Sequence, residues 1–392
     1  MSAAARPPGD VPPPTDPARR FAALRGCDRI LSGARPRTIR ERLAALAALS
    51  KGGEGGEGAA GAAELYDLDE AVDFYGSGIV RALEGRVAGL LGLADAVYFP
   101  TGTMAQQAAL QYWADGEGRT VAMHPLAHPE VHEQRAYSVL SGLRTVWPTR
   151  APRLPTPAEL RALGEPFTTL MLELPLRDAG FVLPTWPELT ALVEAARELG
   201  AYVHLDGARL WETGPHFGRT LPEIAGLANS VYVSCYKTLG ATSGALVAGD
   251  EEFARGVRVW RHRYGGRLFQ QWPAVLTALS GLDTELPRLG AYVANAKEVA
   301  AALAATPGGR VNPDPPHTHQ FQFWLPYPAH ALNRANIRLA ELQGVGLFGG
   351  WDEPGVLPGF SMTEITASEA ALDWTPREIT EAVALFLELA QV

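Results

Sequence analysis

Apolar positions along the chain follow two periods, one typical of amphipathic helices and one typical of buried strands. From Ile79 to Leu93 they recur at helical spacing, and after the turn at Gly92 a short apolar run, Ala96 to Phe99, predicts a strand. A second helix is predicted over Met104 to Trp113, directly after Thr101-Gly-Thr103. In this part of the chain, helix leads into strand and strand into helix.

Further apolar runs are typical of buried strands, and helical patterns such as Leu189 to Leu199 separate them. Strands that alternate with helices form sheets covered on both faces, so the pattern predicts an α/β fold with a mostly parallel sheet. The runs are Thr168 to Glu173, Tyr202 to Leu205, Ser230 to Ser234 and Ala245 to Ala248.

The pattern changes toward the C-terminus, where two half-exposed strands and two helices are expected. We therefore predict a large domain over residues 61–284 and a small α+β domain over residues 285–392. The strands are predicted over His319 to Leu325 and Phe360 to Ile365, and the helices over Ala329 to Glu341 and Pro376 to Leu389.

The first sixty residues are expected to lie outside these domains. Residues 1–20 are rich in Pro and Ala, and we expect them to stay flexible. Residues 21–60 are predicted to contain a short helix, Ile39 to Leu49, and a flexible Gly-Gly-Glu loop, Lys51 to Ala60.

Composition narrows the class of protein. With 392 residues, 47% of them hydrophobic, the chain can bury a large core, and a net charge of −9 argues against a nucleic-acid partner. No apolar run approaches the roughly eighteen residues of a membrane helix, so no membrane partner is expected. Cys27 and Cys235 lie far apart, without metal-ligand spacing or a preceding export signal, which favours a reducing cytoplasm.

The strongest chemical signal is a carboxylate and an amine at the ends of two apolar strands. The chain has three lysines, and Lys237 follows one strand, while Asp206-Gly-Ala-Arg209 ends another. A pyridoxal phosphate site needs this pair, because the carboxylate keeps the pyridine nitrogen protonated and the lysine carries the cofactor as a Schiff base. The alternatives are an Asp that turns the chain with an Arg in a surface ion pair, and a lysine that extends to the solvent.

Two further segments could serve such a site. Thr101-Gly102-Thr103 places hydroxyls and backbone N–H groups at a helix start, which is a phosphate-binding arrangement, although small residues there are also ordinary caps. His124, His128 and His132 form a cluster with Glu133. Two prolines in that segment argue against a metal site, so we expect no metal; one histidine that stacks on the cofactor ring or acts as acid or base is favoured, and a solvated loop is the alternative.

Together these residues resemble the threonine aldolase and β-eliminating lyase family of fold-type-I pyridoxal phosphate enzymes. The match runs from about Asp73 to Leu279. Its motifs are Tyr75-Gly76, Phe99-Pro-Thr-Gly-Thr-Met-Ala-Gln, His128 five residues before Glu133, Asp206-Gly-Ala-Arg209, Lys237, and Gly265-Gly-Arg267.

The resemblance implies a large domain with a seven-stranded sheet and a role for each matched residue. Lys237 would form the Schiff base, Asp206 would pair with the pyridine nitrogen, Gly102 and Thr103 would hold the phosphate, and His128 would stack on the ring. Arg209 would contact the cofactor hydroxyl or the substrate carboxylate. The family also implies a homo-oligomer, dimer or tetramer, in which Tyr75 and Arg267 act across the subunit interface.

The chain departs from the family where the substrate would bind. The family's N-terminal substrate-binding segment is reduced to Arg29-Ile-Leu-Ser32. Ser32 and His132, like Tyr75, are candidates for substrate or inter-subunit contacts. Ser361 stands where a carboxylate-binding arginine is expected, and no histidine follows the strand that ends at Glu173. The expected function is aldol cleavage of a threonine-like β-hydroxy-α-amino acid, with His128, or a water that it orders, as the candidate base for the hydroxyl proton. β-Elimination or transaldol transfer on another amino acid, or a non-catalytic protein that keeps the fold, are the alternatives.

Overall fold

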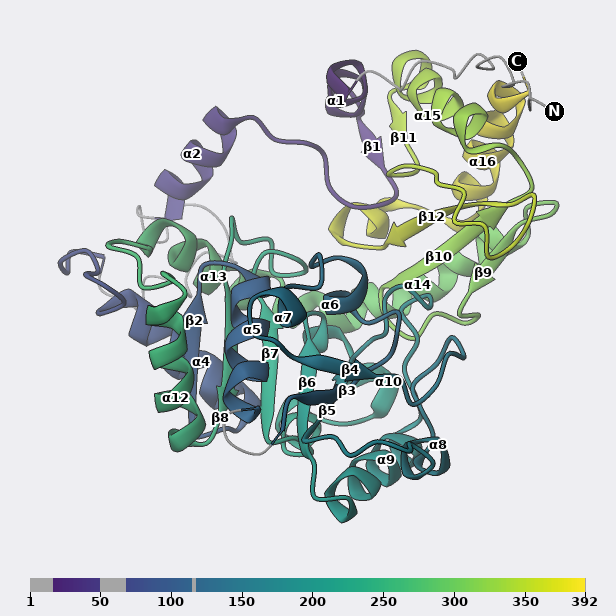
Figure 1. Cartoon of the computed structure of the whole chain (residues 1–392). Coiled ribbons are helices and arrows are strands. Elements are labelled where there is room, and N and C mark those ends of the chain that lie inside the picture. The colour runs from purple at the N-terminus through teal and green to yellow at the C-terminus, as the bar shows by residue number, and fades with distance from the viewer. Residues whose placement is uncertain (1–16, 50–67, 115–117, 392) are drawn as a thin grey trace, which may run out of the picture. The chain divides into compact units, whose positions relative to one another are not determined.

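A computed structural model describes residues 17–49, 68–114 and 118–391 (Figure 1). The Gly-Gly-Glu loop, Lys51 to Ala60, and residues 1–16 of the Pro-rich start lie outside the described residues. Residues 17–20, predicted to be flexible, instead begin helix α1 (Pro17–Arg25), in which Arg19 forms an ion pair with Glu341. The chain separates into two compact units. The large unit holds residues 39–291; the small unit holds residues 292–392 together with those up to residue 38. The division falls in the first turn of α14 (Leu289–Ala304).

The large unit is built on a seven-stranded sheet with the strand order β2-β8-β7-β6-β5-β3-β4. Strand β8 is antiparallel to both of its neighbours, and all the other pairs are parallel. The predicted α/β class with a mostly parallel sheet is confirmed. The strands are β2 (Asp95–Phe99), β3 (Thr120–Ala122), β4 (Arg144–Val146), β5 (Thr169–Glu173), β6 (Tyr202–Gly207), β7 (Ser230–Ser234) and β8 (Ala245–Gly249).

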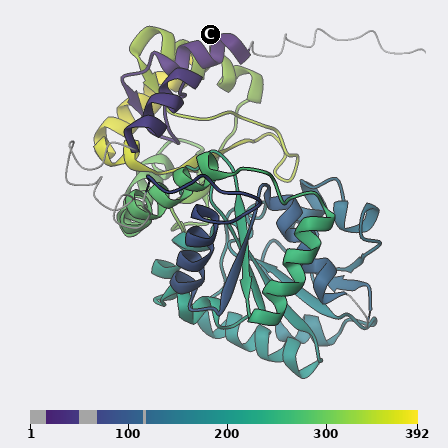
Figure 2. The same ribbon diagram turned by 90° about the vertical axis from the view of Figure 1, so that its left-hand side faces the viewer.

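Helices lie on both faces of this sheet, as the two views in Figure 1 and Figure 2 show. Helices α5 and α12 share one apolar cluster with alternate residues of β2, β7 and β8, among them Phe99, Tyr232 and Val247. The helical segments of the large unit are α2 (Ile39–Leu49), α4 (Ile79–Leu91), α5 (Gly102–Trp113), α6 (His128–Val131), α7 (Ala136–Val139), α8 (Pro157–Arg161), α9 (Trp186–Glu198), η1 (Leu210–Glu212), α10 (Gly214–Phe217), α11 (Leu221–Ala225), α12 (Glu251–Arg263), α13 (Trp272–Thr284) and η2 (Leu286–Arg288).

Local sequence signals explain where these elements begin. Thr185 caps α9 and forms a reciprocal capping box with Glu188, and Thr101 accepts a hydrogen bond from Met104 N at the start of α5. Every residue of β5 and β7 is buried, which is why both strands read as continuous apolar runs rather than as alternating ones.

The small unit has an α+β architecture. Its three-stranded antiparallel sheet has the order β12-β10-β9, and a separate parallel pair joins β1 to β11. Because β1 pairs with β11, residues 29–30 belong with the C-terminal part of the chain. The elements are α1 (Pro17–Arg25), β1 (Arg29–Ile30), β9 (Arg310–Asn312), β10 (Gln320–Leu325), α15 (Ala329–Gln343), β11 (Val345–Gly346), β12 (Ser361–Thr366), η3 (Glu369–Asp373) and α16 (Pro376–Ala390).

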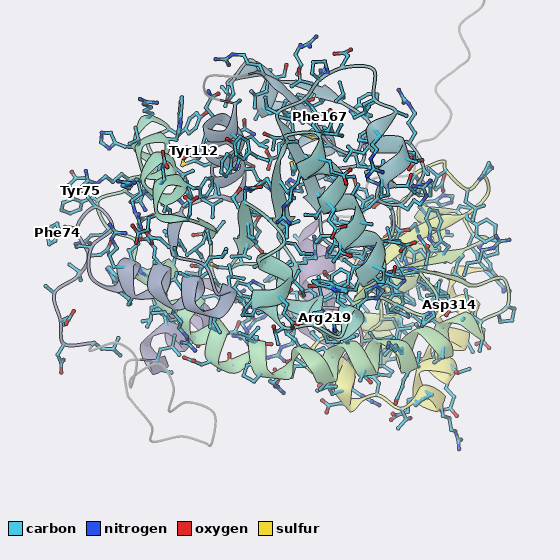
Figure 3. The ribbon with its side chains drawn as sticks, turned by 90° about the horizontal axis from the view of Figure 1, so that it is seen from below. Phe74, Tyr75, Tyr112, Phe167, Arg219 and Asp314 are labelled. Atoms are coloured by element: carbon cyan, nitrogen blue, oxygen red, sulfur yellow. The ribbon has the colours of Figure 1, made fainter. Side chains whose placement is uncertain are left out.

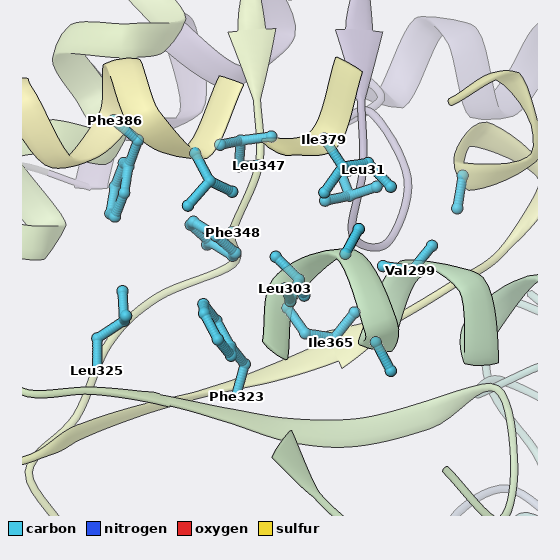
Figure 4. Packing of buried hydrophobic residues seen from close by; sticks show 14 of the residues in the cluster. Leu31, Val299, Leu303, Phe323, Leu325, Leu347, Phe348, Ile365, Ile379 and Phe386 are labelled. Atoms are coloured by element: carbon cyan, nitrogen blue, oxygen red, sulfur yellow. The ribbon is translucent and has the colours of Figure 1, made fainter. Parts of the chain in front are cut away.

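One detail of the predicted small-domain strands is wrong. Strand β10 is buried along its whole length, not half-exposed, because it is the central strand, paired on both sides. Strand β12 alternates between buried and half-buried residues, as a one-sided strand does. Phe323 on β10 packs with Phe348, Phe386 and Leu31 in an apolar cluster of this unit (Figure 4).

Candidate active site

The carboxyl ends of three adjacent parallel strands carry the candidate groups of the large unit. Glu173, the last residue of β5, is in register with Asp206 on β6. Lys237 lies three residues beyond the end of β7, the next strand of the sheet. Open α/β sheets bind their ligands at this edge, so the predicted pair does come together at a ligand-binding position.

Asp206 is a buried carboxylate, with 1% of its surface exposed. Its Oδ1 accepts a hydrogen bond from the backbone N–H of Ala208 at 3.1 Å, and no described residue donates to Oδ2. Burial raises the pKa of Asp206, while the charges of Lys237 and His128 oppose that effect. A positively charged hydrogen-bond donor at Oδ2 would compensate this buried charge.

Lys237 carries an amine that forms no hydrogen bond or ion pair with any residue the structure describes. Burial, and then the charge of Arg209, lowers its pKa to about 8, although the carboxylates of Asp206 and Glu173 act in the opposite direction. A lysine with this pKa has a substantial fraction of neutral amine near pH 7 to 8. It is therefore suited to attack a carbonyl carbon.

The start of α5 offers backbone donors to an anion. Within the described residues, no acceptor receives a hydrogen bond from the N–H of Gly102 or Thr103. A Cβ on Gly102 would lie 2.2 Å from the hydroxyl oxygen of Tyr232, so only glycine fits there. The hydroxyl of Tyr236 is also close, at 3.3 Å from the same point. Free N–H groups and hydroxyls at the N-terminus of a twelve-residue helix suit a phosphate.

His128 is held at the same edge by two carboxylates. Its backbone N–H donates to Glu173 at 2.8 Å, and its ring Nδ1 lies 3.2 Å from Glu133, which also accepts from Gln107. Burial lowers the pKa of His128, but the hydrogen bond to Glu133 and the nearby charge of Asp206 outweigh it, and the net shift is upward. The ring remains 28% exposed and is fixed in orientation.

The other two histidines of the cluster differ from each other. His124 is buried; its Nε2 bonds to the carbonyl of Ala151 and its Nδ1 accepts from the N–H of Leu126. Both nitrogens of His124 are therefore used within the fold. His132 instead is 37% exposed and lies next to Asp178.

Arg209 lies beside Lys237 and follows β6. Its guanidinium stands 5.1 Å from the ring centre of Phe181, and its buried Nε has no hydrogen-bond partner among the described residues. Glu212 is buried nearby and accepts from the hydroxyl of Thr238 at 2.7 Å. Burial raises the pKa of Glu212 to about 7, and the charge of Arg209 acts against that shift.

Tyr75 and Arg267 are in contact, although they are distant in sequence. Arg267 Nε donates to the carbonyl of Tyr75 at 3.2 Å and lies over the Tyr75 ring at 5.4 Å. Phe74 and Phe269 complete an exposed aromatic group, with Phe74, Tyr75 and Phe269 each about half exposed; Figure 3 labels the first two. No described interaction links Tyr75 or Arg267 to Lys237 or Asp206 within one chain.

Two residues with a predicted or expected substrate role lie in the small unit. Ser32 Oγ accepts a hydrogen bond from the N–H of Thr366. Ser361, which stands where an arginine was expected, is buried and donates to the carbonyl of Tyr327 at 2.6 Å. Ser361 therefore supports the fold of its own unit and offers no charge to a carboxylate.

Several residues of the site were missed from the sequence. Glu173 carried a signal, because it ends an apolar strand-like run as Asp206 does. Glu212, Tyr232 and Asp178 carried none, since their importance comes from burial or from a partner distant in sequence.

These features fit pyridoxal phosphate by the chemistry of the donor set. Lys237 supplies a free amine, Asp206 a buried carboxylate with an open oxygen, and Gly102 with Thr103 unpaired N–H groups for the phosphate. Among the described residues, no group of three or more His, Cys, Asp or Glu side chains could hold a metal ion.

Comparison with known proteins identifies the family. The model of the beta-eliminating lyase family matches residues 62–323, about two thirds of the chain. The chain belongs to the beta-eliminating lyase family. As a member it is a pyridoxal phosphate-dependent enzyme of the lyase class, with pyridoxal phosphate as its cofactor.

Solved structures of similar proteins cover nearly the whole chain. A putative aromatic amino acid beta-eliminating lyase/threonine aldolase from Exiguobacterium sp. 255-15 is 35% identical with a TM-score of 0.82, and the match covers 95% of this chain and 99% of that one. A putative L-allo-threonine aldolase from Listeria monocytogenes is 30% identical with a TM-score of 0.82 and covers 95% and 98%. The family resemblance in the sequence is confirmed.

Curated relatives match over a shorter length. Low-specificity L-threonine aldolase 1 of Arabidopsis thaliana is 27% identical over 242 residues, which is 59% of this chain and 68% of the relative. Across eight curated relatives, the match covers 50% to 68% of the relative's own length. In the described part of the chain, no helix is both long and apolar enough to cross a membrane.

Proposed function

We propose that this lyase cleaves a β-hydroxy-α-amino acid of the threonine type into glycine and an aldehyde. The observation that carries the proposal is the free amine of Lys237 next to the buried carboxylate of Asp206 at one edge of the sheet. The names of two similar proteins, a threonine aldolase of Arabidopsis thaliana and a putative L-allo-threonine aldolase of Listeria monocytogenes, support the choice of reaction.

Four residues would hold the cofactor. Lys237 would bind it covalently as a Schiff base, Asp206 would pair with the ring nitrogen, and the N–H groups of Gly102 and Thr103 would bind the phosphate. When bound, pyridoxal phosphate supplies an electron sink for the electron pair left on the substrate Cα. Asp206 maintains that capacity, because its negative charge keeps a proton on the ring nitrogen.

His128 and Arg209 would orient the reactants. The hydrogen bonds of His128 to Glu133 and Glu173 hold its ring at a fixed angle, as stacking on a planar cofactor requires. Arg209 has a buried Nε that lacks a partner among the described residues and a guanidinium that could bind a carboxylate or the cofactor hydroxyl. Since Ser361 offers no charge, Arg209 is our candidate for the substrate carboxylate.

The competing reactions give different products, which makes them separable. The purified protein is loaded with pyridoxal phosphate and incubated with L-threonine, L-allo-threonine, and an alanine that carries a leaving group on Cβ. Aldol cleavage gives glycine and acetaldehyde in equal amounts, β-elimination gives pyruvate and ammonia, and transaldol transfer needs an added aldehyde. Glycine and acetaldehyde from either threonine epimer would support the proposal.

Other outcomes of this experiment overturn it. Pyruvate without glycine would assign β-elimination. Turnover of a hydroxy amino acid only in the presence of a second aldehyde would assign transfer. Cofactor binding without any product would favour a binding protein that keeps the fold.

We also infer that the protein is a homo-oligomer, a dimer or a tetramer, to which Tyr75 contributes an interface residue. Phe74, Tyr75 and Phe269 expose three aromatic rings that contact one another, and Leu268 adds a fourth exposed apolar side chain. Exposed apolar groups of this kind are typical of interfaces. A monomer in sedimentation equilibrium would contradict this inference.

A further inference from the structure

A histidine and an aspartate form a pair near the carboxyl edge of the large sheet. His132, the residue that follows α6, places Nε2 at 2.8 Å and 3.1 Å from the two carboxylate oxygens of Asp178, in the segment that follows β5. His132 is 37% exposed and Asp178 is 20% exposed. Among the described residues, none forms a hydrogen bond with the other ring nitrogen, Nδ1.

The contact with Asp178 fixes which nitrogen of His132 can accept a proton. A carboxylate only accepts hydrogen bonds, and its oxygens lie 2.8 Å and 3.1 Å from Nε2, closer than the donor Arg177 Nη1 at 3.4 Å, so the geometry favours a hydrogen on Nε2. In a neutral imidazole, the opposite nitrogen then has a free lone pair. Asp178 thus holds the ring in the form of a base, in the same way that a carboxylate orients a histidine in hydrolytic triads.

Neighbouring contacts place this pair close to the candidate cofactor site. The ring centres of His132 and His128 are 5.2 Å apart. Arg177 Nη1 lies 3.4 Å from His132 Nε2, and the backbone N–H of Arg177 donates to Glu173. The charge of Arg177 also acts on Lys237.

Charged and titratable groups surround His132 on two sides. His128 faces it from α6, and Arg177 and Asp178 face it from the segment after β5. Of the two exposed histidines here, His128 has its Nδ1 next to Glu133, whereas the corresponding atom of His132 has no partner in the described structure.

We propose that His132, oriented by Asp178, is the base that takes the proton of the substrate's β-hydroxyl group. This assignment rests on the proposed aldol cleavage. His132 Nδ1 accepts the hydroxyl proton, the C–O bond becomes the carbonyl bond of the aldehyde, and the Cα–Cβ bond breaks. The electron pair of that bond remains at Cα, which afterwards takes up one proton and leaves as glycine. The proton on His132 returns to the solvent, so protons and electrons balance.

The test compares two reactions of each variant, because only one of them involves a β-hydroxyl group. In His132→Asn, the cleavage of L-allo-threonine or L-threonine should fall about a hundredfold, the lower range for general-base catalysis. The exchange of a glycine α-proton with deuterated water should stay within about twofold of wild type. Asp178→Asn should lower cleavage about tenfold, and His262→Asn, an exposed histidine on α12, should change neither reaction.

A spectrum provides a readout that a merely structural role would not move. Nitrogen-15 NMR of the protein without cofactor should show the Nε2-protonated form of His132, and Asp178→Asn should shift it toward a mixture of both forms.

Different results would refute the proposed aldol cleavage and the assignment of His132 as the base. Wild-type protein that cleaves no β-hydroxy amino acid would refute the proposed function and this assignment together. Cleavage by wild type and by His132→Asn at rates within twofold would refute only the role of His132. An equal loss of cleavage and of glycine exchange would show that His132 acts in folding or cofactor binding, and would also overturn the proposal.

Discussion

The two sides of the candidate site are built differently. Asp206 and Lys237 come from strand ends of the large sheet, and Asp206 is only 1% exposed. His132 and Asp178 come from the end of a four-residue helix and from a connecting segment, and they are 37% and 20% exposed. The proposed partner of the cofactor's ring nitrogen is thus part of the packed core, whereas the proposed base and its partner are partly exposed.

This difference agrees with the resemblance in the sequence, in which the expected cofactor motifs match the family more fully than the expected substrate motifs. A change at Asp206 or Gly102 disturbs buried neighbours and also the cofactor, so it costs both stability and function. A change at His132 or Asp178, whose side chains are 37% and 20% exposed, disturbs fewer buried atoms, so other side chains can take up the substrate there. Variants of the cofactor-binding residues are therefore expected to impair every reaction of the enzyme. Variants of His132 or Asp178 are expected to impair only the removal of the hydroxyl proton.

The largest effect is expected for Lys237→Ala. Without the amine no covalent link to the cofactor forms, so turnover of every amino acid substrate should fall by more than about a thousandfold. Steady-state assays with the best substrate measure this loss. Lys297→Ala is the matched control, because Lys297 is exposed on α14 and should leave the rate unchanged. Near-normal turnover in Lys237→Ala would show that Lys237 does not bind the cofactor covalently.

Gly102→Ala should have an intermediate effect. It should lower both the affinity for pyridoxal phosphate and the free energy of unfolding. The new Cβ would lie 2.2 Å from the hydroxyl oxygen of the buried Tyr232, so the start of α5 must shift. We expect a loss of roughly 1–3 kcal/mol in the free energy of unfolding. Pyridoxal phosphate should bind about tenfold more weakly, which a fluorescence titration measures.

Gly85→Ala on α4 is the control for this substitution. A Cβ on Gly85 has nothing within 4 Å, and the helix should gain roughly 0.5–1 kcal/mol from alanine. Equal cofactor affinity in both variants would show that the start of α5 does not bind the phosphate.

Most of the large sheet was predictable because buried strands leave a strong pattern. The runs at β5, β6, β7 and β8 were predicted to within a few residues, since each contains large apolar side chains within a short segment rich in β-formers. Strands β3 and β4 were missed because they have three residues each, too few to show a period. The burial of β10 was missed because it depends on pairing with strands on both sides.

In the candidate site too, residues marked by their own segment were predictable, and contacts between distant segments were not. The Asp206 and Lys237 motifs were visible because each residue ends an apolar run in its own segment. The pairing of His132 with Asp178 was not, because it joins two irregular segments 46 residues apart. Nor could the sequence show that His124 uses both ring nitrogens within the fold, which leaves only His128 and His132 available.

The smallest effect is expected for Glu212, the buried carboxyl group near Arg209. It concerns how the free energy of unfolding depends on pH. Burial raises the pKa of Glu212 to about 7 in the folded protein, above its ordinary value near 4.5. Between these two values the folded state binds more protons than the unfolded state, so the contribution of Glu212 to stability falls as pH rises from about 4.5 to 7. Glu212→Gln removes this contribution and keeps an oxygen that can accept the hydrogen bond of Thr238.

Thermal unfolding of the protein without cofactor, from pH 4.5 to 8, measures the effect. The Tm of Glu212→Gln should match that of wild type near pH 4.5 and exceed it by a few degrees near pH 8. Some pH dependence should remain, because Glu173 also has a pKa raised to about 7 by burial and by Asp206. Parallel curves for wild type and Glu212→Gln would mean that Glu212 is not held in a desolvated site, and the contrast between a buried cofactor side and an exposed substrate side would then be weaker than the structure indicates.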